Sequence, residues 1–170
     1  SQLEGIHYLR TFGNSDAIRA DAEQAENVVL IGGSFIGTEV AASLTKMGKK
    51  CAIVMQEEIT LELPFGKEVG GFFHRLLTDK GVDIHGGDEL ERFEGDGERV
   101  RKVVTKSGAE LDADMVVVGI GVTPEVTLAK GAGLELGERG GVRVSSRLEA
   151  SCPDVYAAGD IAEYDSVVHG

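Results

Sequence analysis

Apolar residues fall into short runs that are separated by glycines and by stretches with a helical period. The run Val28–Ile31 is followed directly by Gly32 and Gly33, which is typical of a buried parallel strand that ends in a tight turn. Small and apolar residues then recur at helical spacing until Gly48, and a second apolar run covers 51–55. The pattern predicts a strand, a turn, a helix and a parallel strand.

The helical period returns after this unit. Between Lys67 and Lys80 one helix face carries apolar side chains, and Gly81 follows as a stop signal. These side chains are Val69, Phe72, Phe73, Leu76 and Leu77. We expect this helix to lie over the sheet and residues 82–85 to form the next parallel strand.

Two shorter stretches flank these elements. Residues 15–25 have the composition of a helix, with Asn14 or Ser15 as its N-terminal cap. Residues 59–64 are expected to form a loop or a short extended piece. Neither stretch changes the predicted class of fold.

After residue 90 the spacing of apolar residues changes from the helical period to the alternation typical of short strands. Segments 91–94, 100–105 and 110–114 are separated by turn signals and are typical of an antiparallel meander. A fully apolar strand, Met115–Val118, follows. The prediction is an α/β fold: a Rossmann-like, doubly wound parallel sheet with an antiparallel three-stranded meander.

The turn at 32–37 carries the first candidate chemistry. Gly32 and Gly37 take the first and third places of a Gly-x-Gly-x-x-Gly pattern, and Ser34 takes the second. A turn without bulky side chains lets the backbone approach a diphosphate, and a helix N-terminus offers N–H groups and positive partial charge. We therefore predict a dinucleotide site, although a glycine-containing turn that binds nothing has the same pattern. The Ser34 hydroxyl is placed to cap the helix or to reach a phosphate.

A second glycine-rich turn follows the strand Met115–Val118. Gly119 and Gly121 stand at the carboxyl end of this strand, where ligands bind in open α/β sheets. The alternative is a plain turn in which Thr123 and Pro124 start a helix over 125–130.

Charge and hydropathy restrict the partners. The sequence holds 29 acidic and 17 basic residues, a formal charge of −12, which argues against nucleic acid and against an anionic membrane surface. The longest apolar run, Met115–Val122, is too short to span a bilayer, so no membrane segment is expected. The cysteines, Cys51 and Cys152, have no metal-ligand spacing, and no metal site is predicted. A cytoplasmic location is the expectation.

With these motifs and the segment Asp154–Asp160, the chain resembles the pyridine nucleotide-disulfide oxidoreductase superfamily. It is most similar to the branch of FAD-dependent NADH reductases that serves ferredoxins and rubredoxins and includes apoptosis-inducing factor. The resemblance implies that Gly159 and Asp160 belong to the second flavin motif, in which the aspartate bonds the ribityl chain of FAD.

The resemblance also implies a division of the chain. Residues 1–8 would flank an FAD domain, 9–130 would form the NAD(H)-binding domain, and 131–170 would return to the FAD domain with the second flavin motif. An N-terminal FAD half and a C-terminal interface domain are expected to be missing, and the chain alone is not expected to hold FAD.

Within the NAD(H) site, backbone N–H groups would surround the diphosphate, and these belong to Gly32, Gly33, Ser34, Phe35, Ile36 and Gly37. The resemblance places Glu39 near the nicotinamide, although an acidic residue in a first helical turn is also favourable by itself. Gly119 and Gly121 would flank the cofactor from the other strand end.

The ribose contact departs from the family pattern. The place of the usual acidic residue falls near Met55, so Glu57 or Gln56 is the expected substitute, with solvated loop charges as the alternative. No Arg or Lys occurs between Cys51 and Pro64, which favours NADH over NADPH.

The implied function is the NAD(H)-binding portion of an oxidoreductase that passes hydride from NADH to FAD and electrons to a small iron-sulfur carrier such as ferredoxin or rubredoxin. Two other hypotheses stay open: a non-catalytic, NAD(H)-binding redox-sensing module and a disulfide reductase of the same superfamily. A methyltransferase is disfavoured by the second glycine-rich turn and the flavin-type segment.

Overall fold

The computed structural model describes residues 3–165, which belong to two compact units that divide between Gly121 and Val122. We describe each unit separately. The proposed NAD(H)-binding domain, 9–130, takes in nearly all of the first unit and the beginning of the second. The assignment of these stretches to cofactor domains remains a proposal.

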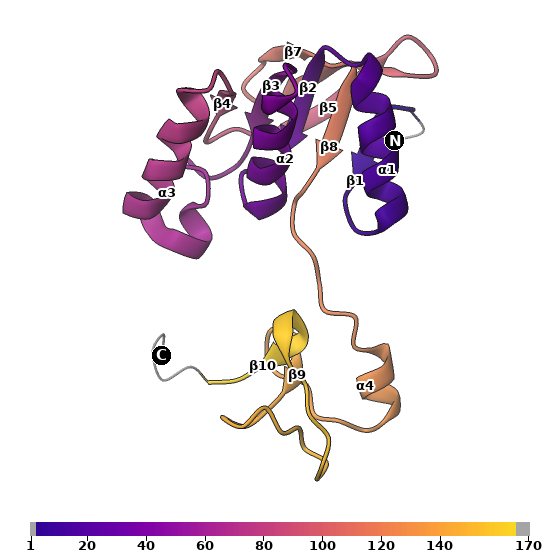
Figure 1. Cartoon of the computed structure of the whole chain (residues 1–170), viewed down its shortest axis with the longest axis vertical. Helices are drawn as coiled ribbons and strands as arrows, with labels where there is room; N and C mark the ends of the chain where they lie inside the picture. The colour runs from indigo at the N-terminus through magenta and orange to yellow at the C-terminus, as the bar shows by residue number, and fades with distance from the viewer. Residues whose placement is uncertain (1–2, 166–170) are drawn as a thin grey trace. The chain divides into compact units, whose positions relative to one another are not determined.

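A five-stranded parallel sheet forms the centre of the first unit (Figure 1). Its strands lie in the order β1 (Ile6–Tyr8), β8 (Met115–Val118), β2 (Asn27–Ile31), β3 (Lys50–Val54) and β4 (Asp83–His85). Strand β2 pairs on one side with β3 and on the other with β8, so the most apolar strands lie in the middle. The predicted order of strand, turn, helix and parallel strand is confirmed.

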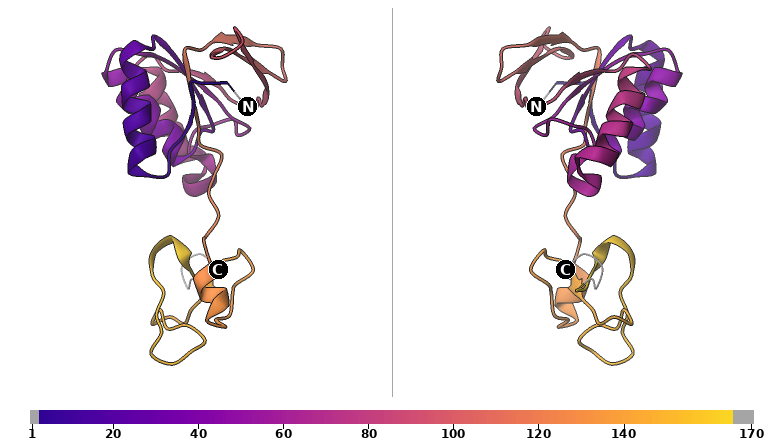
Figure 2. Two further views of the ribbon diagram at one scale, coloured as in Figure 1. Left: turned by 90° about the vertical axis from the view of Figure 1, so that its right-hand side faces the viewer. Right: turned by 90° about the vertical axis from the view of Figure 1, so that its left-hand side faces the viewer.

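The two faces of this sheet are covered differently, as Figure 2 shows. Helices α1 (Phe12–Gln24), α2 (Phe35–Lys46) and α3 (Glu62–Thr78) lie on one face, and an antiparallel sheet lies on the other. That sheet consists of β5 (Leu90–Gly95), β6 (Val100–Thr105) and β7 (Glu110–Asp112). Alternate residues of β2 enter separate apolar clusters, since Val28 and Leu30 pack toward one side and Val29 and Ile31 toward the other. The predicted fold class and meander are confirmed.

The cap predicted for the first helix is wrong. Helix α1 begins earlier, and Thr11 is its N-cap. The Asn14 N–H donates to Thr11 Oγ1 (3.3 Å), and the Thr11 N–H donates to Asn14 Oδ1 (3.0 Å). Asn14 therefore acts as the third helical residue of a capping box, and the helix starts three residues before Ser15.

The start of α3 also differs from the prediction. Residues 62–64, expected as a loop or extended piece, form the first turn of the helix, after Leu61 in the left-handed conformation (φ 58°). A kink follows at Gly66, whose φ is +72°. A positive φ is readily adopted by glycine, and this allows the helical turn at 62–65 to meet the longer helix at an angle.

The apolar face of α3 is only partly buried. Val69, Phe72 and Leu76 are each about half exposed, whereas Leu77 is buried. Gly70 is also buried, and a Cβ there would lie 2.7 Å from the Thr60 carbonyl oxygen, so the helix packs closely on the segment that precedes it. The expected helix is present, with Leu77 in the core and much of its predicted apolar face exposed.

The second unit contains α4 (Thr127–Gly131), β9 (Val142–Arg143), the 3-10 turn η1 (Gly159–Ile161) and β10 (Ala162–Glu163). Helix α4 follows Val126 as N-cap, so the helix start at Thr123 and Pro124, which the sequence offered as an alternative, does not occur. The buried carboxylate of Glu163 accepts hydrogen bonds from the N–H groups of Arg139 (3.0 Å) and Gly141 (3.0 Å). It thereby fixes the turn that precedes β9.

Candidate functional site

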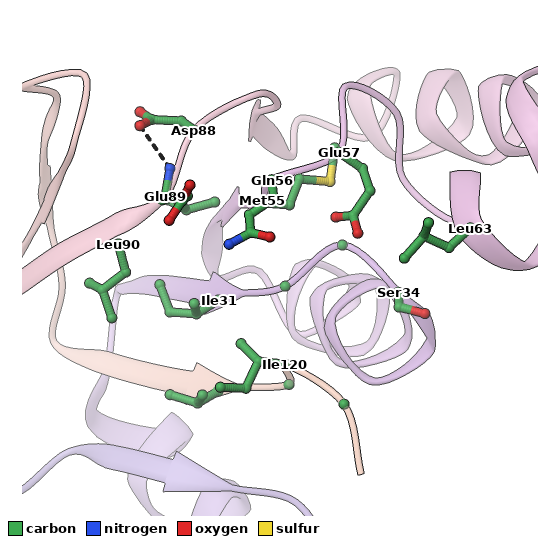
Figure 3. Close-up of a pocket in the computed structure, with 16 residues that line it drawn as sticks. Ile31, Ser34, Met55, Gln56, Glu57, Leu63, Asp88, Glu89, Leu90 and Ile120 are labelled. Carbon is green, nitrogen blue, oxygen red and sulfur yellow. Dashed lines mark hydrogen bonds between the residues drawn. The ribbon is translucent and has the colours of Figure 1, made fainter. Parts of the chain in front are cut away.

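A pocket of about 550 Å³ opens in the first unit at the carboxyl ends of the central strands (Figure 3). Strands β2, β3 and β8 each end at it, with Ile31, Val54 and Val118. The other lining residues are Gly32, Gly33, Ser34, Met55, Gln56, Glu57, Leu63, Asp88, Glu89, Leu90, Gly119, Ile120 and Gly121. This is the edge at which open α/β sheets bind ligands.

The turn between β2 and α2 is built from backbone contacts that side chains would prevent. The Gly32 N–H donates to the Val54 carbonyl (2.8 Å), and Gly32 has a φ of +108°. A Cβ at Gly32 would lie 2.3 Å from the Gly119 carbonyl oxygen, and one at Gly37 would lie 1.9 Å from the Gly32 carbonyl oxygen. Glycines are therefore required for the helix to begin this close to the strand ends.

Ser34 is the N-cap of α2 and lines the pocket. Its side chain makes no capping hydrogen bond, so one of the two roles expected for its hydroxyl does not apply. The first N–H groups of a helix have no acceptor within the helix. Because α2 starts at the pocket, these N–H groups are placed to receive an anion.

The end of β8 forms the opposite side of the pocket. The Gly119 N–H donates to the Ile31 carbonyl (2.8 Å), and a Cβ at Gly119 would lie 3.0 Å from Ile36 Cγ2. Ile120 is largely exposed and lines the pocket, as Figure 3 shows. Gly121 has a φ of +103°. The two glycine-rich turns are thus in direct contact.

The end of β3 supplies Met55, Gln56 and Glu57. Met55 is buried and packs against Gly33. A Cβ added at Gly33 would lie only 1.9 Å from Met55 Sδ. Gln56 is exposed and Glu57 half-buried (Figure 3). Met55 therefore packs on the turn, and the polar groups come from the next two residues, as the sequence led us to expect.

A further wall of the pocket was not predicted. It comes from the loop after β4, residues 88–90, and from Leu63 in the first turn of α3. Asp88 is buried and accepts from the Ser107 hydroxyl (2.6 Å), the Ser107 N–H (3.1 Å) and the Glu89 N–H (2.8 Å). These hydrogen bonds hold the pKa of Asp88 far below its usual range, and the bond from the Ser107 hydroxyl has the largest effect. Polar residues after the predicted strand 82–85 were the available signal, because that strand ends at the same edge.

Some predicted residues lie outside the pocket lining. Phe35, Ile36 and Gly37 belong to the first turn of α2, and Phe35 packs edge-on against Phe65 with ring centres 5.6 Å apart. Glu39 is exposed on the next turn of α2. Gly159 and Asp160 are exposed and belong to η1 of the second unit. The structure thus brings together the residues expected at the diphosphate and ribose, apart from these helical ones.

Residues 3–165 contain neither a metal-ligand cluster nor a membrane-spanning helix. No three His, Cys, Asp or Glu side chains in this range are grouped so that they could hold a metal ion. None of the helices in the same range has both the length and the apolar character that a membrane crossing needs.

The parallel sheet with glycine-rich turns at the carboxyl ends of its strands is an arrangement that many dinucleotide-binding α/β proteins share. Residues 2–170 match the model of the pyridine nucleotide-disulphide oxidoreductase family, and the chain belongs to this family. The predicted family is therefore confirmed. FAD and NAD(P)H are the cofactors that this family uses.

Three relatives illustrate the range of the family. The chain is 38% identical over 170 residues to the NAD(P)H coenzyme A polysulfide/persulfide reductase of Pyrococcus horikoshii, covering 99% of this chain and 38% of the relative. It is 35% identical over 162 residues to the ferredoxin–NAD(+) reductase component of the Paraburkholderia xenovorans biphenyl dioxygenase system, covering 95% and 39%. The solved structure of a ferredoxin reductase from Rhodopseudomonas palustris superposes with a TM-score of 0.87 at 34% identity, covering 98% of this chain and 41% of that one.

The chain therefore spans about two fifths of the length of these relatives.

Proposed function

We propose that the first unit binds NADH and that the chain is the NAD(H)-binding portion of an FAD-dependent oxidoreductase. The observation that supports this most strongly is the contact among Gly32, Gly37 and Gly119. It leaves backbone rather than side chains at the start of α2, beside a pocket of about 550 Å³. That is the arrangement a dinucleotide diphosphate requires.

Each part of the pocket has a proposed task. The N–H groups at 33–37 and the Ser34 hydroxyl would hold the diphosphate, with Gly119 and Gly121 on the other side. Gly32 was expected among these donors, but its N–H is bonded to the Val54 carbonyl, so it would contribute only the shape of the turn. Glu57 would accept hydrogen bonds from the adenosine ribose hydroxyls, and the Gln56 amide would accept or donate one there. Glu39, one helical turn further on, is proposed to face the nicotinamide end. Asp88 would not contact the ligand through a free oxygen, because its carboxylate already holds the 105–107 turn.

The second unit carries the residues proposed for the flavin. Gly159 has a φ of +78°, and the Asp160 side chain beside it is exposed, so the segment has room for a ligand at this aspartate. FAD, when bound, would supply the acceptor for hydride from the nicotinamide. The contribution of this chain would be to bind and orient both groups.

The electron acceptor is proposed to be a small iron-sulfur carrier, as the names of the ferredoxin reductases among the relatives suggest. A persulfide or disulfide reductase is the second candidate, because the Pyrococcus relative is named as one at 38% identity. Of the cysteines, Cys51 is buried in the first unit, and Cys152 is exposed in the second. Burial raises the pKa of the Cys51 thiol, which disfavours its reactive thiolate.

Calorimetric titration of this chain with NADH tests the proposal. Glu57→Ala is expected to raise the Kd for NADH by roughly 10- to 150-fold, since a hydrogen bond to a charged group contributes about 1.5–3 kcal/mol. Glu58→Ala is the matched control: Glu58 is the next residue, it is exposed, and it is not part of the pocket lining. Equal Kd values for Glu57→Ala and the parent would remove Glu57 from the site, and absence of NADH binding by the parent would contradict the proposal itself.

A further inference from the structure

Glu89 in the wall of the pocket is paired with a lysine from a distant part of the sequence. Lys106 Nζ contacts Glu89 Oε2 (2.5 Å), and the Lys106 N–H donates to the Glu89 carbonyl (2.8 Å). Glu89 precedes β5, and Lys106 directly follows β6, so pairing of these two strands brings the residues together. The side chains are 41% and 60% exposed, which leaves the lysine free to change its rotamer.

The ribose end of the pocket is otherwise acidic. Glu57, Asp88 and Glu89 line it, and none of the described lining residues is basic. Asp88 stays ionised because Ser107 and the Glu89 N–H bond its carboxylate. Lys106 is a cation that the fold brings to this end through its ion pair with Glu89.

We propose that Glu89 determines the preference for NADH over NADPH by keeping Lys106 in this ion pair. The inference rests on the proposed binding of NADH and concerns the same pocket. NADPH differs by a 2′-phosphate on the adenosine ribose, and a dianionic group there would meet the carboxylates of Glu57 and Glu89. An unpaired lysine ammonium would attract the same phosphate as a point charge.

The ion pair is suited to this role because it is weak. Pairs between exposed side chains stabilise a fold little, so replacing Glu89 is not expected to unfold the meander. Asp88 and the pairing of β5 with β6 hold the loop in place without it. Once the Glu89 charge is removed, Lys106 is available to a phosphate, and one repulsive carboxylate is lost.

The test compares the Kd values of NADH and NADPH for the whole chain, by calorimetry at low salt. In Glu89→Gln the ratio of the two Kd values is expected to shift toward NADPH by about tenfold. The double variant Glu89→Gln with Lys106→Ala is expected to lose most of that shift. Lys106→Ala alone is expected to weaken NADPH binding further, because Glu89 is then left without its cation.

Glu110→Gln is the matched control. Glu110 pairs with Lys102 (2.7 Å) on the same antiparallel sheet but lies outside the pocket lining, and its loss should leave the ratio unchanged. An unchanged ratio in both Glu89→Gln and Lys106→Ala overturns the inference while NADH binding by the parent still supports the site. If the parent binds neither nucleotide, the proposed function fails and this inference fails with it.

Discussion

A methyl group added at Gly37 should damage both the fold and the site. The Cβ of Gly37→Ala would lie 1.9 Å from the Gly32 carbonyl oxygen, whereas ordinary contact begins at 3.4 Å. The obstacle is backbone, which cannot rotate away as the end of a side chain does, so the turn must move by more than an ångström. Overpacking of this kind costs about 1–3 kcal/mol. The better helix propensity of alanine returns only about 0.5–1 kcal/mol, so we expect a net loss of about 1–2 kcal/mol.

Urea unfolding and NADH titration together measure this effect. Displacement of the turn should also raise the Kd for NADH by more than about tenfold, since diphosphate binding depends on the position of these N–H groups. Gly13→Ala makes the same chemical change in α1, where the nearest atom to the new Cβ is 3.9 Å away. It should leave the NADH affinity unchanged and raise the free energy of unfolding by up to about 0.5–1 kcal/mol, since no clash offsets the helix propensity of alanine. A Gly37→Ala protein with the urea midpoint and NADH affinity of the parent would refute the reasoning from close contact.

Two further predictions concern stability. In the second unit, hydrogen bonds from the N–H groups of Arg139 and Gly141 lower the pKa of Glu163, so its stabilising effect is present above the unfolded value of about 4.3 and is lost as the pH falls through the lower folded value. Glu163→Gln should therefore lower the Tm at pH 7 more than at pH 3 in calorimetric melts, and an equal loss at both would contradict this. In the first unit, Thr11→Ala should lower the free energy of unfolding by about 1 kcal/mol through loss of the capping box, which urea titration would detect; an unchanged midpoint would show that the cap contributes nothing.

The positions of the central strands, and the change from parallel to antiparallel strands along the chain, could be predicted because the signals for them are local. Runs such as Val28–Ile31 and Met115–Val118 are apolar throughout, and both proved to be central strands buried on two faces. The meander was visible from turn residues between short alternating segments. The sequence does not show, however, that the meander rather than a further helix covers one face of the sheet, because that depends on contacts between Val29 or Ile31 and residues such as Val103.

The helix ends were less predictable. The cap of α1 is Thr11 because Asn14 bonds back to it, and a Ser or Asn nearer the apolar run has the same local preference. The first turn of α3 follows Leu61 in a left-handed conformation, which a leucine side chain rarely adopts. Val69 and Phe72 are about half exposed, and apolar periodicity alone does not show how much of a helix face other elements will cover.

The candidate site likewise contains residues that the sequence could predict and residues that it could not. Its glycine-rich turns and the residues after β3 follow from motif and strand position. The contribution of Asp88 and Glu89 depends on the meander, because Ser107 and Lys106 hold these residues from across the antiparallel sheet. Such contacts between distant parts of the chain are not encoded in the spacing of any motif.

Positions within the tight turn at 32–37 are under different evolutionary constraints. At Gly32 and Gly37 a new side chain meets backbone, so mutation there is opposed by folding before binding is considered. At Ser34 a side chain is already present and makes no capping bond, so drift at this position changes what the pocket presents to a ligand at little structural cost. A lineage can thus alter its affinity for a cofactor while the architecture that supports it stays under purifying selection.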